Sequence, residues 1–148
     1  MKQLNEIEVV VNKLAKVIGA SKDQLPTYGV SRDFGYPHIE VHNNEYHYVV
    51  VERGQELERK STVDFNELLY WVFSDATHSM AFNYELNNRI EDQDCRRIAF
   101  PKQIELMSEI SEEMGNSTES DIAEILKNNP YDDKPTKRVN RMRNDNAI

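Results

Sequence analysis

The sequence predicts an α+β fold, with an N-terminal helix, a small three-stranded antiparallel sheet, and a C-terminal group of three helices packed on that sheet. Three observations predict it. An apolar stripe with helical spacing opens the chain, β-rich segments follow over residues 38–62, and helical spacing of apolar residues returns after residue 64. A run of strands followed by a run of helices is typical of this class.

The composition fits one soluble domain, which we expect to span residues 1–133. The chain has 148 residues, of which 39% are hydrophobic and 30% charged, so it is long enough to bury a core without disulfides or metals. No apolar run approaches the roughly 20 residues that a membrane span needs. The N-terminus has no signal-peptide pattern, and the single Cys95 forms no internal disulfide. We therefore expect a cytoplasmic protein.

The net charge of −8 is unevenly distributed. Residues 134–148 have no apolar period and predict a basic, disordered tail. The charged residues of this tail are Lys134, Lys137, Arg138, Arg141, Arg143 and Asp145. They sum to +4, so residues 1–133 carry −8 minus 4, or −12. Such an acidic body repels nucleic acid and attracts basic partners. The alternative is that the negative charge serves only to keep the protein soluble.

The first helix is predicted from one apolar stripe that ends before Gly19. The stripe consists of Leu4, Ile7, Val11, Leu14 and Ile18. Residues 20–37 contain two glycines, two prolines and scattered aromatic residues, which indicates an ordered loop with room for one short strand.

A two-residue turn at Asn43-Asn44 is predicted to join the first two strands. This turn pairs Ile39 with Tyr48 and Val41 with Tyr46, so these four side chains share one face.

A second turn at Arg53-Gly54 begins the third strand, at about residues 55–62. The same register would place Leu57 opposite Val50 on the apolar face. The rest of this strand is polar, and the charges of Glu56, Glu58, Arg59 and Lys60 suit an edge strand.

A long helix is predicted from its N-cap Asp64 to about Ile90. Its core stripe consists of Phe65, Leu68, Leu69, Val72, Ala76 and Met80.

Two further helices follow the long one. The first covers 98–115 and ends at Gly115, with Pro101 either in its first turn or kinking a longer helix. Thr118 is expected to cap a short last helix that stops before Pro130.

Polar residues alternate on the other face of the predicted sheet. His38, Glu40, His42 and His47 share that face, with Glu40 opposite His47. Imidazole and carboxylate groups together bind transition metals, but a solvated sheet face needs polar residues at the same positions. We favour the solvated face and expect no metal and no cofactor.

A second stripe on the long helix mixes aromatic and charged residues. It consists of Trp71, Asp75, His78, Phe82, Glu85 and Arg89. The first four are candidate partner-binding residues, because exposed aromatic and charged side chains are typical of protein-binding surfaces. The alternative is a packing seam in which Glu85 and Arg89 form an i,i+4 ion pair.

The charged residues around this helix end are Glu85, Arg89, Glu91, Asp94, Arg96 and Arg97. We interpret them as a structural ion-pair cluster, with the arginines bridging to Glu85 or Glu91. A catalytic alternative would need a carboxylate with a tuned pKa. The sequence has no glycine-rich phosphate loop and no known nucleophile motif, and Cys95 has no evident histidine base. We therefore do not expect an enzyme.

Part of the chain resembles a known bacterial family, the immunity protein 63 family of polymorphic toxin systems. The matching residues are Tyr84-Glu85-Leu86, Arg89-Ile90-Glu91, Asp94, Arg96-Arg97, Phe100 and Gln103-Ile104-Glu105-Leu106. Glu124-Ile125-Leu126 and Pro130-Tyr131-Asp132-Asp133 resemble its closing motif. The resemblance covers residues 75–133, while the N-terminal helix and sheet agree only in general layout. Pro101 departs from the pattern, and the tail has no counterpart.

The resemblance implies a non-enzymatic protein that binds a cognate toxin domain in the cytoplasm and blocks it. Together with the charge, it suggests a basic nuclease-type toxin held through the acidic surface. Two alternatives stay open. One is a hydrolytic or metal-binding enzyme that uses residues 85–97, and the other is a general adaptor that uses residues 71–82.

Overall fold

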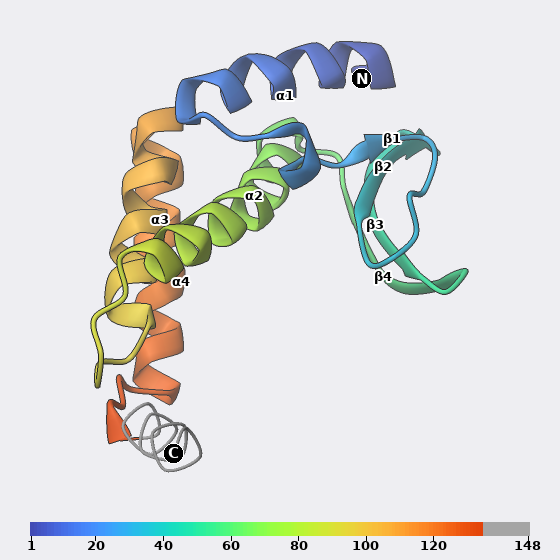
Figure 1. Ribbon diagram of the computed structural model, residues 1–148. Coiled ribbons are helices and arrows are strands. Elements are labelled where there is room, and N and C mark those ends of the chain that lie inside the picture. The colour runs from blue at the N-terminus through green and yellow to red at the C-terminus, as the bar shows by residue number, and fades with distance from the viewer. Residues whose placement is uncertain (135–148) are drawn as a thin grey trace. The chain divides into compact units, whose positions relative to one another are not determined.

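The computed structural model describes residues 1–134, which form the predicted α+β fold (Figure 1). Its elements are α1 (Leu4–Ile18), the 3₁₀ turn η1 (Lys22–Gln24), β1 (Thr27–Tyr28), β2 (Pro37–His42), β3 (Glu45–Glu52), β4 (Gln55–Thr62), α2 (Phe65–Asn87), α3 (Arg96–Ile110) and α4 (Glu112–Asn128). The chain divides into two compact units, the first ending at Ala76 and the second beginning at Thr77, both within α2. Apart from Lys134, the predicted basic tail lies outside the described residues. No helix in the described part is long and apolar enough to cross a membrane.

Helix α1 confirms the first predicted helix. Its apolar stripe is buried at Ile7, Val11 and Ile18. Gly19 has a φ of 72°, a left-handed conformation that glycine adopts without steric strain, and it ends the helix as predicted.

The sheet has four strands in the order β1-β2-β3-β4, so the predicted count of three is wrong. The extra strand, β1, pairs in parallel with β2 through Thr27 and His38. A strand of two residues has too few positions to show alternation. The glycines and prolines around it therefore predict a loop for this segment. The remaining pairs are antiparallel, and the predicted register of Ile39 with Tyr48 is confirmed.

The expected inward position of Leu57 is wrong. Val50 pairs with Glu58, whereas Val51 pairs with Glu56, so a β-bulge inserts Leu57 as an extra residue. The bulge leaves Leu57 59% exposed. The predicted turn at Arg53 and Gly54 is present, so the error lies in the register after the turn. A bulge shifts this register without changing the residue pattern, and alternation alone does not reveal it.

In the first unit, α2 packs on the apolar face of the sheet. The Tyr46 ring lies 5.7 Å from the Phe65 ring, and the Tyr48 ring lies 6.4 Å from the Trp71 ring. The segment before α1 also contacts the sheet, because the backbone N–H of Lys2 donates to the Tyr46 hydroxyl over 3.0 Å.

In the second unit, α3 and α4 lie side by side (Figure 1). The predicted boundary between them is wrong. Ser111 ends α3 and caps α4, its hydroxyl accepting from the Met114 N–H, so Gly115 and the buried Thr118 lie inside α4. Gly115 was interpreted as a helix end, but its missing side chain instead leaves room for Ser108 of α3. Pro101 lies inside α3, beyond its first turn.

Candidate functional site

Two of the candidate partner-binding residues, Trp71 and Asp75, contact the sheet within the first unit. The Lys60 ammonium lies 5.0 Å from the centre of the Trp71 ring. The Asp75 carboxylate accepts a 2.5 Å hydrogen bond from the Tyr48 hydroxyl. Burial, followed by the Asp75 charge, raises the pKa of Tyr48 well above its usual range. These contacts fit a packing seam at this end of the stripe.

The other two candidates, His78 and Phe82, lie in the second unit. Their rings are 4.5 Å apart, and Phe82 meets Phe100 of α3 edge-on at 6.4 Å. Phe82 is half-buried by such contacts, whereas His78 is exposed. A partner-binding role for the four residues stays a prediction.

Glu85 and Arg89 form the i,i+4 ion pair that one interpretation predicted. Glu85 is only 2% exposed, and Arg89 donates to its two carboxylate oxygens over 2.9 and 3.0 Å. The hydrogen bonds to Glu85 raise the pKa of Arg89. A buried carboxylate with a bidentate arginine stabilises the end of α2.

Asp94 lies where the C-terminal segment meets the start of α3. Its carboxylate accepts from the Arg96 guanidinium over 2.9 Å and from the backbone N–H groups of Arg96 and Asp132 over 3.0 and 2.9 Å. These hydrogen bonds, with that from Arg96 the largest, lower the pKa of Asp94 to about 2. Arg96 also donates to the carbonyls of Asn129 and Pro130, which follow α4.

Asp133 and Tyr131 complete this arrangement. Asp133 accepts from the Asp94 N–H over 2.6 Å and from Arg97 over 3.1 Å. The Arg97 guanidinium lies 4.6 Å from the centre of the Tyr131 ring. We call Asp94, Arg96, Arg97, Tyr131 and Asp133 the Asp94 clasp.

The ion pairs of the Asp94 clasp differ from those that the sequence predicted. Arg96 and Arg97 bridge to Asp94 and Asp133 and not to Glu85 or Glu91, and Glu91 is exposed. The sequence predicted partners on neighbouring turns of one helix, whereas Asp133, the partner of Arg97, is 36 residues away along the chain. A general acid needs a raised pKa, and that of Asp94 is lowered, so the geometry suits a structural clasp better than acid–base chemistry.

The polar sheet face has the predicted register. Glu40 lies opposite His47, and it accepts hydrogen bonds from His38, His42 and Arg59. Although partial burial by itself raises the pKa of Glu40, these three partners lower it to about 2. His47 stacks on His42 with ring centres 4.0 Å apart and contacts the Ser61 hydroxyl.

The expectation that this whole face is solvated is wrong for His38 and His47, which are buried. The His38 Nε2 bonds to Glu40 and the His47 Nδ1 to Ser61, whereas the His38 Nδ1 is buried without a hydrogen-bond partner among the described residues. Within residues 1–134, no three His, Cys, Asp or Glu side chains are grouped to hold a metal ion.

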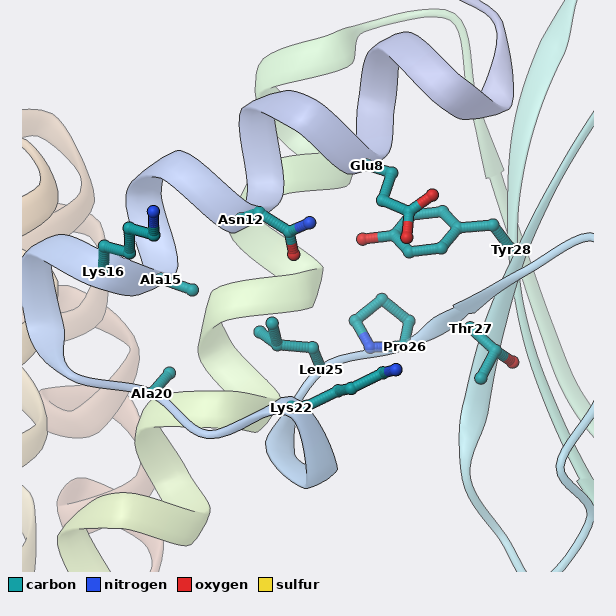
Figure 2. A pocket seen from close by; sticks show the side chains of 10 residues that line it. All are labelled: Glu8, Asn12, Ala15, Lys16, Ala20, Lys22, Leu25, Pro26, Thr27 and Tyr28. Atoms are coloured by element: carbon teal, nitrogen blue, oxygen red, sulfur yellow. The ribbon is translucent and has the colours of Figure 1, made fainter.

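A cavity of about 670 Å³ lies in the first unit between α1 and residues 20–28 (Figure 2). Figure 2 shows Glu8 and Asn12 of α1 beside the Tyr28 ring, with Lys22 across from them. The Tyr28 hydroxyl is buried without a hydrogen-bond partner among the described residues, and burial raises its pKa. The apolar pattern does not predict this cavity, although the spacing of four from Glu8 to Asn12 and Lys16 places these three residues on one helix face.

Exposed acidic residues follow one another along the end of α3 and most of α4. Between residues 105 and 124 every charged residue is an acid, and each of these side chains is exposed. They are Glu105, Glu109, Glu112, Glu113, Glu119, Asp121 and Glu124. We call this set the acidic α3–α4 surface. It localises much of the negative charge that the composition indicated.

Comparison with known proteins places the chain in a family. The family model described as Immunity protein 63 matches residues 42–124, which is more than half of the chain. No curated protein and no solved structure matches. The match extends further toward the N-terminus than the resemblance at residues 75–133 indicated, since it includes β3 and β4, and it ends before Tyr131 and Asp133 of the clasp.

Proposed function

This chain belongs to the immunity protein 63 family, whose members are non-enzymatic inhibitors, and on that premise we propose that it binds a basic, nuclease-type toxin domain through the acidic α3–α4 surface. Family membership implies toxin neutralisation. The chemistry of the toxin and the surface that contacts it are our proposal.

The proposal rests on the charge of residues 105–124, in which every charged side chain is acidic. The seven acids between residues 105 and 124 contribute −7, with no lysine or arginine among them. Lys102, just before this segment, pairs with Glu105 over 3.5 Å. Glu119 and Glu124 have no ion-pair partner among the described residues, so their charges remain available to a basic ligand. Enzymes that act on nucleic acid need a positive cleft, and such a cleft attracts this surface.

Electrostatic attraction of this kind acts mainly on the rate of association. Complementary surface charges increase the encounter rate of two proteins by about tenfold to a thousandfold at low ionic strength. Salt removes the effect, because the Debye length falls to about 10 Å at 0.1 M. Salt-dependent association is therefore the signature to measure.

The binding partner for the test is a candidate toxin domain chosen from the genes next to the one for this chain. We expect the double substitution Glu119→Lys and Glu124→Lys to slow association with this domain by about tenfold at low salt. Both side chains are exposed, and lysine has about the same helix propensity as glutamate, so the fold is retained. Stopped-flow fluorescence over a range of salt concentrations measures the rate.

The matched control is Glu52→Lys with Glu91→Lys, which makes the same change in net charge at exposed positions outside the acidic α3–α4 surface. The control is expected to slow association by less than about threefold, because only long-range attraction is lost. Equal slowing by both pairs, or no dependence on salt, would contradict the proposed surface.

A further inference from the structure

The cavity beside α1 in the first unit has the size and the lining of a small-molecule site (Figure 2). All its lining residues come from α1 and residues 20–28, and its volume of about 670 Å³ is within the range of such sites. Three of them, Ala15, Leu25 and Pro26, are apolar and buried. Ligand pockets combine an apolar lining with a few polar groups that fix the ligand, so the polar groups of this cavity indicate what it binds.

The Tyr28 hydroxyl is a buried polar group of this cavity that lacks a partner. No hydrogen bond within residues 1–134 reaches it. Burial, followed by the charge of Glu8, raises the pKa of Tyr28, so the phenol is neutral and can both donate and accept a hydrogen bond. Almost all buried hydroxyls in folded proteins are paired. The unpaired Tyr28 hydroxyl therefore marks the place where a polar ligand group would bind.

Two further acceptors lie on the face of α1 toward which this hydroxyl points. Figure 2 shows the hydroxyl directed at α1, where Glu8 and Asn12 lie. Both side chains are exposed, and neither has a hydrogen-bond or ion-pair partner within the described residues, so each can change its rotamer to admit a ligand group. A carboxylate, an amide oxygen and a phenol oxygen together supply the three acceptors that the three N–H groups of a primary ammonium need.

The cavity has a positive charge opposite these acceptors. Figure 2 shows Lys22 across the cavity from Glu8 and Asn12, and Lys22 has no ion-pair partner in the part of the chain that the structure describes. A ligand with only one charge would leave either Glu8 or Lys22 unmatched. A ligand that carries both charges matches both ends of the cavity, and such matching determines which ligands a site accepts.

We propose that this cavity binds a small zwitterion, an amino acid whose primary ammonium contacts Glu8, Asn12 and Tyr28 and whose carboxylate contacts Lys22. The hydrocarbon part of the ligand packs against the apolar lining at Leu25 and Pro26. The proposal does not depend on the proposed function, because no lining residue belongs to the acidic α3–α4 surface and the test uses no toxin domain.

The test is isothermal titration calorimetry of the full chain with two zwitterions that differ in the separation of their charges, leucine and ε-aminocaproate. Each is compared with the corresponding amine and the corresponding carboxylic acid, which carry one charge. At least one zwitterion is expected to bind with a Kd of about 1 mM or lower. Its two singly charged analogues are expected to bind at least about tenfold more weakly, because each lacks one charged hydrogen-bonding group.

Variants of the lining residues assign the contacts. Glu8→Gln and Lys22→Gln are each expected to raise the Kd at least about tenfold. Lys13→Gln is the matched control, since Lys13 is exposed on α1 and does not line the cavity, and it should leave the Kd unchanged.

Tyr28→Phe has a signature that a purely structural hydroxyl would not give. Because it removes an unpaired buried hydroxyl, its midpoint of thermal unfolding without ligand is expected to be at least that of the wild type, while its Kd rises. A lower midpoint would show that the hydroxyl has a partner within the protein, which contradicts the proposal. Equal binding of a singly charged analogue, or no binding of either zwitterion to the folded wild type, would overturn it.

Discussion

Replacing Gly115 with valine is expected to lower the free energy of unfolding by about 3 kcal/mol, because it overpacks the contact between α3 and α4. A Cβ atom at this position would lie 2.1 Å from the Ser108 hydroxyl oxygen and 3.0 Å from the Ser108 Cα. The hydroxyl could rotate away, but the Cα belongs to the α3 backbone, so the two helices would have to separate. Urea denaturation followed by circular dichroism measures the loss.

The control for this prediction is Asn116→Val, which places the same side chain at the next, exposed position of α4. It is expected to lower the free energy of unfolding by less than about 1 kcal/mol, mainly through the lower helix propensity of valine. Adding Ser108→Gly to Gly115→Val should recover part of the loss, because it removes the two nearest atoms. Equal stability of Gly115→Val and Asn116→Val would show that the helices do not approach as closely as described.

Asp94→Ala is expected to lower the free energy of unfolding by about 3 kcal/mol and to release residues 130–133 from α3. Asp94 is 7% exposed, and its removal leaves the Asp132 N–H without its acceptor. The Arg96 guanidinium loses its carboxylate partner and keeps the Asn129 and Pro130 carbonyls. Hydrogen exchange at Asp132 should become faster, since that N–H loses its partner. Glu91→Ala, at an exposed site three residues earlier, is the control and should change stability little.

The pH dependence of this loss follows from the lowered pKa of Asp94. The pKa is about 2 in the folded protein against 3.8 ordinarily, so the folded state favours the carboxylate. The resulting stabilisation, about 2 kcal/mol, is fully present above about pH 4 and is lost as the pH falls toward 2. The difference in stability between the wild type and Asp94→Asn should therefore shrink over this range. A difference that stays constant down to pH 2 would contradict the ionised clasp.

Elements with several repeats of a period could be predicted from the sequence. The apolar stripe and Gly19 predicted α1, and the turn at Asn43 and Asn44 predicted the register of Ile39 with Tyr48. Elements without such repeats could not. The two residues of β1 show no alternation, and the bulge at Leu57 depends on hydrogen bonding between strands and not on the residue pattern.

The α3–α4 boundary shows how one residue type can indicate two structures. Gly115 follows an apolar stripe, as a helix-ending glycine does, yet it lies inside α4 because only hydrogen fits beside Ser108. The stronger signal was Ser111 followed by Glu112 and Glu113, a helix N-cap with acids in its first turn.

The charged residues of the candidate site could be predicted, but their partners could not. Asp94 and Arg96 were recognised from the charged run, while their contacts with residues 129–133 join segments more than 30 residues apart.

The central claim is that this chain neutralises a toxin domain by binding it. The most direct measurement is co-expression of a candidate toxin domain, chosen from the genes next to the one for this chain, in a bacterial host with and without the chain. The account predicts that growth is restored and that the two proteins purify together as a stable complex. Continued growth arrest with the folded chain present at an equal amount, and no complex on purification, would contradict it.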